Sequence, residues 1–255
     1  MSKTIAVLNQ KGGVGKTTTA VNVGAYLAKA GKSVLLVDLD PQGNATSGLG
    51  IDKQALNETL YDALFNHQTA PSILQETTIS GLQILPSNAN LAGAEVQLVS
   101  SLQRELQLRQ MLEQFHQDII LIDCPPSLGL LTINALSASD FVMIPVQTEY
   151  YALEGLGQLL GVVQRVKEAI NPSLEILGVL LTMYDSRTSL SDQVMAEVKK
   201  HFNEKVFSTV IPRNIRLAEA PSFGQPISEH DKWSKGARAY KQLAKEITQR
   251  LGGKN

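Results

Sequence analysis

The strongest chemical signal in the chain is a glycine-rich segment with two lysines. In order, the segment reads Gln10-Lys11-Gly12-Gly13-Val14-Gly15-Lys16-Thr17-Thr18. Glycines let successive backbone N–H groups point at phosphate oxygens, and a helix that begins here adds the positive end of its dipole. Lys16 can offset the charge of the β- and γ-phosphates of a nucleotide, and the Thr17 hydroxyl can ligate Mg²⁺. The segment therefore predicts a nucleotide site formed by residues 11–18.

The segment departs from the standard phosphate-loop pattern at its start. That pattern places a glycine five residues before Gly15, where this chain has Gln10, and Lys11 is an additional cation. Lys11 is either a second positive charge for the nucleotide or a solvated surface lysine. The spacing alone leaves both interpretations open.

Acidic residues follow two apolar strands. One predicted strand ends in Asp38, and Asp40 comes two residues later, on the same face of a continuing strand. A second apolar run, Ile119–Asp123, delivers Asp123 to the same carboxyl edge, where ligands of parallel sheets bind. Because Mg²⁺ prefers water and a few carboxylates, we expect Asp123 and the Thr17 hydroxyl to hold the ion.

A parallel sheet is needed to bring these residues together. Short apolar runs alternate with longer helical patterns, which is typical of parallel strands covered by helices on both faces. The predicted strands are Thr4–Asn9, Ser33–Asp38, Leu82–Leu85, Ile119–Asp123, Phe141–Val146, Ile176–Thr182 and Val206–Ile211. The predicted helices are Lys16–Ala30, Glu95–Phe115, Leu153–Ile170, Ser191–Phe202 and Ser234–Leu251. We expect an α/β fold with one doubly wound, mostly parallel sheet flanked by helices, in a single domain over residues 1–255.

Composition excludes several classes of protein. In 255 residues, 43% are hydrophobic and 18% charged, which excludes wholesale disorder, and only 5% are aromatic, which argues against base-stacking single-strand binders. One cysteine, Cys124, cannot form an internal disulfide or a cysteine-based zinc site, and we expect it to be a small packed residue. No apolar run approaches about 18 residues, and the N-terminus lacks a signal-peptide pattern, so we expect a cytoplasmic protein without a membrane partner.

The net charge of −1 hides an uneven distribution. Residues 1–186 carry 10 Lys and Arg against 17 Asp and Glu, a net charge of −7. Residues 187–255 carry 13 against 7, a net charge of +6. A basic C-terminal quarter is compatible with binding to a polyanion and also with a solvated helix surface.

With its extra lysine, the glycine-rich segment resembles the deviant Walker A motif of the ParA/MinD group of P-loop ATPases. In that family the extra lysine reaches across a nucleotide-sandwiched dimer to the partner's phosphates, and the resemblance implies this role for Lys11. The residue that matches Asp40 positions the attacking water, and the one that matches Asp38 lies by the Mg²⁺. The resemblance therefore implies an ATP hydrolase with ATP and Mg²⁺ as cofactors and with Lys11, Lys16 and Asp40 as catalytic residues.

A late loop resembles the base-binding loop of the same family. Pro212 and Asn214 match positions that contact adenine, and the Met183-Tyr184-Asp185 turn is expected to contribute. The stretches Asp38–Asn44 and Pro212–Pro221 are most similar to those of small, Soj-like chromosome-partitioning members.

The resemblance to Soj-like members implies a DNA surface and protein partners. Such proteins form ATP-dependent homodimers, bind double-stranded DNA without sequence preference, associate with the nucleoid and are stimulated by a ParB-type centromere-binding protein. The candidate phosphate contacts here are Arg187, Lys199, Lys200, Arg213 and Arg216, with Lys232, Lys235 and Arg238 as possible additions. Contacts of this kind give affinity without reading sequence.

Two other functions have to be weighed against DNA partitioning. A MinD-like, membrane-cycling ATPase for division-site placement needs an amphipathic C-terminal segment, but residues 244–255 contain only two large aliphatic side chains, Ile247 and Leu251. A non-enzymatic scaffold that merely holds nucleotide is the third possibility, and the presence of both Lys16 and Asp40 argues against it.

Overall fold

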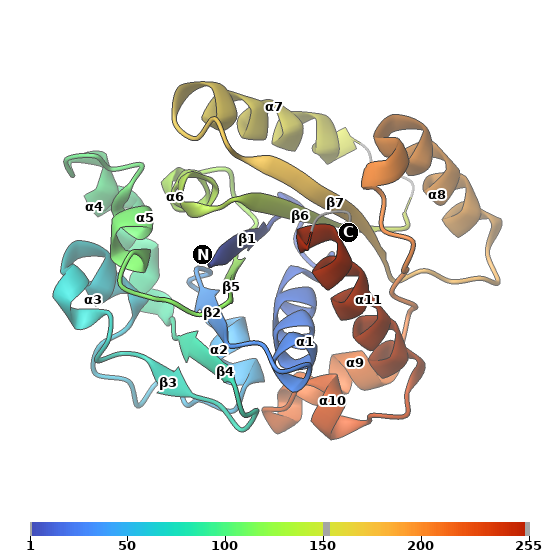
Figure 1. The fold of residues 1–255 in the computed structure, drawn as a ribbon, viewed down its shortest axis with the longest axis horizontal. Helices are drawn as coiled ribbons and strands as arrows, with labels where there is room; N and C mark the ends of the chain where they lie inside the picture. The colour runs from blue at the N-terminus through green and yellow to red at the C-terminus, as the bar shows by residue number, and fades with distance from the viewer. Residues whose placement is uncertain (1, 150–153, 253–255) are drawn as a thin grey trace.

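The computed structural model describes residues 2–149 and 154–252. Within them lies one seven-stranded sheet with the order β3-β4-β2-β5-β1-β6-β7 (Figure 1). All neighbouring strands are parallel except β3, which pairs antiparallel with β4 at the edge. The strands are β1 (Lys3–Val7), β2 (Val34–Asp38), β3 (Gln75–Glu76), β4 (Leu82–Leu85), β5 (Ile119–Asp123), β6 (Phe141–Gln147) and β7 (Glu175–Thr182).

Alternate residues of each central strand enter two separate hydrophobic cores. In β1, Ile5 and Val7 pack on one side of the sheet, whereas Ala6 and the following Leu8 pack on the other. Every residue of β2 and β5 is buried, which explains their unbroken apolar sequences. The predicted doubly wound, mostly parallel sheet is confirmed.

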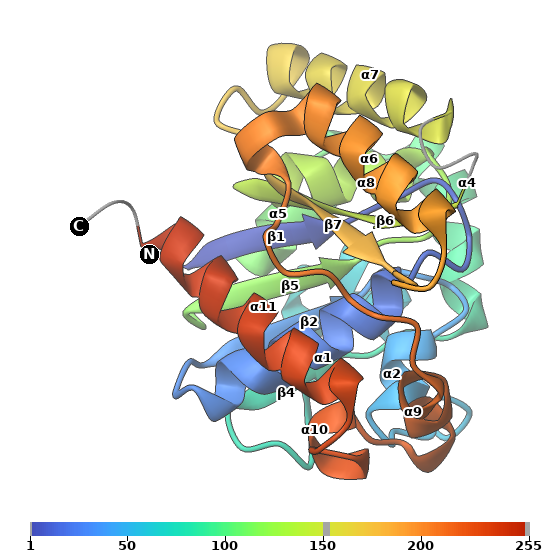
Figure 2. The same ribbon diagram turned by 90° about the vertical axis from the view of Figure 1, so that its right-hand side faces the viewer.

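Helices cover both faces of the sheet. On one face lie α1 (Lys16–Lys29), α2 (Asn44–Gly48), α10 (Ile227–His230) and α11 (Lys235–Leu251), as Figure 2 shows for α1 and α11. The other face packs against α3 (Leu60–Phe65), α4 (Ala94–Val99), α5 (Gln107–Leu112), α6 (Leu130–Ala138), α7 (Glu154–Ala169) and α8 (Ser189–Phe202). The short α9 (Ile215–Glu219) lies near α2 at the carboxyl edge of the strands (Figure 2).

The prediction of a strand at Val206–Ile211 is wrong, because the structure has no strand there. Val206 makes only an isolated bridge to Val179 of β7. The backbone N–H groups of Ser208 and Thr209 donate to the carboxylate of Glu246 on α11, at 2.8 and 3.0 Å, instead of to a strand. Phe207 N and Ile211 N still donate to the Val179 and Leu181 carbonyl oxygens of β7, each at 2.9 Å. Between them, a side chain more than 35 residues away takes two N–H groups and interrupts the pairing, and no local sequence pattern predicts this contact.

The predicted helix Glu95–Phe115 is in fact two short helices. α4 ends at Val99 and α5 begins at Gln107, with Gln103 between them at φ +49°. A positive φ cannot continue a right-handed helix. The first residue of the predicted helix Leu153–Ile170 lies outside the described residues, and α7 is described from Glu154. Between α2 and β4, the chain forms the short helix α3 and the two-residue strand β3.

Among residues 2–149 and 154–252, the longest apolar stretches in helices are too short to cross a lipid bilayer.

Candidate nucleotide site

The glycine-rich segment joins the end of β1 to the start of α1, at the carboxyl edge of the sheet. Gly13 and Gly15 have φ angles of +74° and +89°, in the left-handed region where glycine has no steric cost. A Cβ atom added at Gly12 or Gly13 would meet nothing within 4 Å. Both glycines therefore face open space, and backbone N–H groups of such a loop before a helix can receive an anion.

Lys16 lies over this loop. It is only 7% exposed, and its Nζ donates to the carbonyl oxygen of Lys11 at 3.1 Å. Burial lowers the pKa of Lys16, while the nearby carboxyls of Asp123 and Asp40 oppose that shift. A buried ammonium whose hydrogen-bond partner, among residues 2–149 and 154–252, is one carbonyl oxygen suits an added anionic group.

Asp38 and Asp123 stand side by side at the ends of β2 and β5. They are direct partners in the parallel register, and neither is exposed. Burial raises the pKa of Asp38 to about 6, although hydrogen bonds from Thr46 counteract the rise. Burial and the adjacent Asp38 raise the pKa of Asp123 well above its usual value, and the nearby Thr17 hydroxyl only partly offsets this.

The Asp123 carboxylate fits a cation. Both of its oxygens are buried, and neither has a hydrogen-bond partner among the described residues. Two buried acids with a threonine hydroxyl close by suit Mg²⁺, which keeps several waters and needs few protein ligands. Thr17, Asp38 and Asp123, predicted to lie together, do so. In the part of the chain that the structure describes, no group of three or more His, Cys, Asp or Glu side chains gathers as a metal site.

Asp40 lies in the loop that follows β2. It is 8% exposed, and its Oδ1 accepts a hydrogen bond from the backbone N–H of Gln42 at 2.9 Å. Its charge acts on both Asp38 and Lys16. The side chain is therefore held at the edge of the same cluster, where a carboxylate can orient a water molecule. Cys124, beside Asp123, is buried as expected, and burial raises its thiol pKa.

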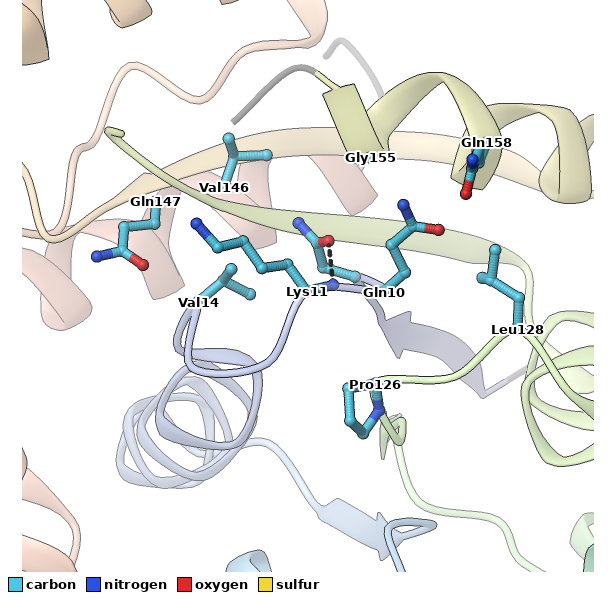
Figure 3. Close-up of a pocket in the computed structure, with 10 residues that line it drawn as sticks. Gln10, Lys11, Val14, Pro126, Leu128, Val146, Gln147, Gly155 and Gln158 are labelled. Carbon is cyan, nitrogen blue, oxygen red and sulfur yellow. Dashed lines mark hydrogen bonds between the residues drawn. The ribbon is translucent and has the colours of Figure 1, made fainter. Parts of the chain in front are cut away.

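Lys11 points away from the phosphate loop. Its Nζ pairs with Glu149 at 2.9 Å, just after β6, and both side chains are about 40% exposed. Figure 3 shows Lys11 and Gln10 turned in opposite directions along β6. They line a cavity of about 650 Å³ whose other walls come from Pro126, Leu128, Gln147 and Gly155, among others. Glu149 was not among the predicted site residues, because no local pattern connects it to a lysine 138 residues earlier.

A second cavity, of about 390 Å³, adjoins the phosphate loop. Gly15 and Thr18 form one wall, and the loop after residue 211 forms another. The two predicted base contacts, Pro212 and Asn214, both line it, as does Met183. The Asn214 side-chain oxygen caps α9 by accepting a hydrogen bond from Arg216 N at 2.9 Å. This hydrogen bond fixes the orientation of the Asn214 side-chain amide. The buried Tyr240 of α11 also lines this cavity, and it was not among the predicted site residues.

Tyr184 and Asp185, which were also expected at the base-binding loop, do not line this cavity. Tyr184 pairs with Pro212 in an isolated bridge, and Asp185 does not line the cavity but holds Arg187. The Arg187 guanidinium donates from Nε and Nη2 to the two Asp185 oxygens at 2.9 and 2.7 Å. This contact holds the pKa of Asp185 well below its usual range.

Three of the five predicted DNA contacts are in ion pairs within the chain. Arg187, 84% exposed, pairs with Asp185, and Arg216 pairs with Glu219 and Asp231. Lys200 lies 3.6 Å from Glu197 on α8. Arg187 and Arg213 lie near the same acid, since both act on the pKa of Asp185. Lys199 is exposed on α8.

Comparison with known proteins places the chain in a family. A family described as an AAA domain matches residues 2–176. The sporulation initiation inhibitor protein Soj of Bacillus subtilis is 59% identical over 249 residues, which cover 97% of this chain and 98% of that protein. The chromosome partitioning protein ParA of Myxococcus xanthus is 50% identical over 98% of this chain and 89% of its own length.

A solved structure also matches this chain over nearly its whole length. Cobyrinic acid a,c-diamide synthase from Mycobacterium smegmatis, with a bound ATP analogue and magnesium, superimposes with a TM-score of 0.88 at 38% identity. The match covers 99% of this chain and 97% of that one. The parallel sheet, the phosphate loop at its carboxyl edge and these matches define a P-loop ATPase. Within that class, the chain belongs to the ParA/MinD family, and it is similar over nearly its whole length to Soj and ParA partitioning proteins.

Proposed function

We propose that the chain is a DNA-partitioning ATPase that works as a nucleotide-driven switch. ATP and Mg²⁺ drive two copies into a sandwich dimer, the dimer binds double-stranded DNA without sequence preference, and hydrolysis releases it. The position of Lys11 carries the proposal. Its ammonium group is paired with Glu149 on the wall of an open cavity rather than turned into its own phosphate loop. A lysine so placed can serve the nucleotide of a second copy once the pair with Glu149 is broken.

Each proposed site residue has a separate role. Residues 11–18 hold the phosphates, Pro212 and Asn214 contact the base, and Thr17, Asp38 and Asp123 hold Mg²⁺. The bound ion supplies positive charge against the phosphate oxygens. Lys16 places its ammonium group at the β- and γ-phosphates, and Asp40 orients the attacking water. We propose that residues 1–255 act together as one ATPase domain, since α11 packs on α1, which begins at the phosphate loop.

The proposed DNA surface is basic and lies on late elements. Its residues are Arg187, Lys199, Lys200, Arg213 and Arg216, with Lys232, Lys235 and Arg238 as additions. Lys232, Lys235 and Arg238 are all exposed. Because they would contact phosphates only, affinity should depend strongly on salt and little on sequence. The proposal also includes a cytoplasmic, nucleoid-associated location and a ParB-type partner that accelerates hydrolysis.

The C-terminal helix argues against membrane cycling. Ile247 of α11 is fully buried and Leu251 is partly buried, both against the core on the α1 face of the sheet. The apolar side of the described part of this helix is therefore already covered. We propose no membrane partner, and sedimentation with liposomes in the presence of ATP tests this directly: binding to vesicles but not to DNA would favour the membrane function.

DNA binding under three nucleotide conditions tests the proposal. The full-length protein is titrated onto a labelled duplex of arbitrary sequence with Mg·ATP, with Mg·ADP and without nucleotide, each over a salt series. We expect binding with ATP only, weakening linearly in log–log form as salt rises. Equal binding in all three conditions, or no binding in any, would contradict the proposed switch.

A further inference from the structure

Among the described residues, two of the three hydrogen bonds to the Asp38 carboxylate come from Thr46, a residue that the proposed mechanism has not used. Thr46, on α2, is fully buried. Its backbone N–H donates to Asp38 Oδ2 at 2.8 Å, and its hydroxyl donates to the same oxygen at 2.6 Å. Both donors therefore occupy one oxygen of the carboxylate. The other oxygen, Oδ1, receives only a long contact of 3.4 Å from Asp40 N among the described residues.

The direction of the Thr46 hydroxyl is fixed from the opposite side. The backbone N–H of Ser87, just beyond β4, donates to Thr46 Oγ1 at 2.9 Å. An N–H can only donate, so Thr46 Oγ1 must accept here and its own proton is left for Asp38. Ser87 is also fully buried, and its hydroxyl donates to the Asp40 carbonyl oxygen at 3.0 Å. Thr46 of α2 and Ser87 after β4 thus hold the end of β2 and the loop behind it, where Asp38 and Asp40 lie.

We propose that Thr46, oriented by Ser87, is a positioning residue that fixes the Asp38 carboxylate so that Oδ1 faces the Mg²⁺ site beside Asp123. This inference rests on the proposed role of Asp38 at Mg²⁺. Asp38 and Asp123 are register partners, and the Asp123 oxygens have no protein partner among the described residues. With Oδ2 tied down twice, the carboxylate cannot rotate Oδ1 away from its neighbour without losing two hydrogen bonds to a charged group.

Three variants of the full-length protein test this role. Thr46→Val keeps the shape and the backbone N–H but removes the hydroxyl, Thr46→Ser keeps the hydroxyl, and Asp38→Asn removes the charge. Thr132→Val is the control, since Thr132 is also fully buried but its hydroxyl donates to the Ser127 carbonyl oxygen at 2.6 Å. The probe is Mg²⁺ itself, titrated into protein mixed with a fluorescent methylanthraniloyl-ATP, with melting temperature measured in parallel.

The expected result separates a positioning role from a purely structural one. Removing a partner that orients a metal ligand typically costs about 10–100-fold in metal affinity, so the Mg²⁺ concentration for half-saturation should rise by about that factor in Thr46→Val. It should stay within about twofold of the parent in Thr46→Ser and Thr132→Val, because both preserve the hydrogen bonds to Asp38. Should Thr46→Val fail to fold, Thr46→Cys takes its place, because a thiol is a weak donor.

Several outcomes would overturn the inference. An unchanged Mg²⁺ half-saturation in Thr46→Val, with or without a lower melting temperature, would reduce Thr46 to a structural residue. Equal shifts in Thr46→Val and Thr46→Ser, or in the Thr132→Val control, would do the same. If Asp38→Asn shifts the half-saturation while Thr46→Val does not, only the positioning inference fails. If Asp38→Asn causes no shift, the proposed Mg²⁺ role of Asp38 fails, and the inference fails with it.

Discussion

At the scale of single residues, the site concentrates buried charge that the protein alone does not neutralise. Lys16, Asp38 and Asp123 are all buried. Burial lowers the pKa of Lys16 and raises the pKa of both acids, so it favours the neutral form of each group. Isolated buried charges are costly, and proteins keep them chiefly where they bind something. A triphosphate and a divalent cation together supply the missing partners of both signs.

Replacing Lys16 of the phosphate loop should remove productive ATP binding. Hydrogen bonds to a charged group contribute about 1.5–3 kcal/mol, so Lys16→Ala should weaken ATP binding by at least about tenfold and hydrolysis by more. Binding of fluorescent ATP and release of phosphate measure the two effects. Turnover equal to that of the parent would reject the assignment of this loop.

Replacing Asp123 with asparagine should stabilise the nucleotide-free protein and weaken its proposed Mg²⁺ site. Asp123 is buried with no hydrogen-bond partner among the described residues, so Asp123→Asn removes the cost of a buried charge. A gain of about 1 kcal/mol would raise the melting temperature by roughly 2–4 °C in a protein of this size. Differential scanning calorimetry without nucleotide checks this, and a lower melting temperature would contradict our interpretation of the cluster.

At the scale of elements, the sequence predicted the features that depend on neighbouring residues, namely most strands and the phosphate loop. The unbroken apolar runs predicted six of the sheet's strands within a few residues, and the glycine spacing located the phosphate loop. The pairing of Lys11 with Glu149, the Thr46–Asp38 contacts and the tie between Arg187 and Asp185 were not predictable, because the first two join separate elements and the third depends on a turn geometry. The strand predicted at 206–211 fails for the same kind of reason, since the Glu246 side chain of α11 takes two of its backbone N–H groups.

One glycine shows how tightly this segment is packed against the sheet. A Cβ at Gly178 of β7 would lie 2.7 Å from Lys205 O, from the Phe207 ring and from the Arg250 guanidinium. Arg250 also donates to the Leu177 and Val206 carbonyl oxygens and stacks on Phe207 at 4.1 Å. The space around Gly178 is therefore closed on three sides.

Gly178→Ala should destabilise the fold. Overpacking of this kind typically costs about 1–3 kcal/mol. Gly161→Ala on α7 is the matched control: its added Cβ meets nothing within 4 Å, and replacing a helical glycine should stabilise by about 0.5–1 kcal/mol. Urea unfolding of both variants gives the comparison. Equal stabilities of the two variants would show that the segment yields to the extra methyl group.

At the scale of the whole molecule, the proposed DNA surface has to compete with the protein's own acids. Arg187 is 84% exposed, yet its guanidinium is already bidentate with Asp185. The chain's uneven charge, +6 in residues 187–255, still gives this part of the surface an excess of cations. DNA phosphates would share Arg187 with Asp185 or replace that acid.

Reversing this charge should weaken DNA binding without affecting the dimer. Arg187→Glu should lower affinity for all sequences alike and reduce the slope of the log–log salt dependence by about one for each phosphate that is no longer neutralised. Fluorescence anisotropy across the salt series measures the slope, and size-exclusion chromatography with light scattering checks the dimer. Unchanged DNA affinity would place the surface elsewhere.

The most direct test of the account is the mass of the Asp40→Ala variant in solution with saturating Mg·ATP. Removing the acid that orients water should leave ATP bound and uncleaved, so that the sandwich accumulates. We predict a particle of twice the chain mass of 27.7 kDa by light scattering, and a single-chain mass with ADP. A single-chain mass with ATP as well would contradict the nucleotide-dependent dimer on which the proposed function depends.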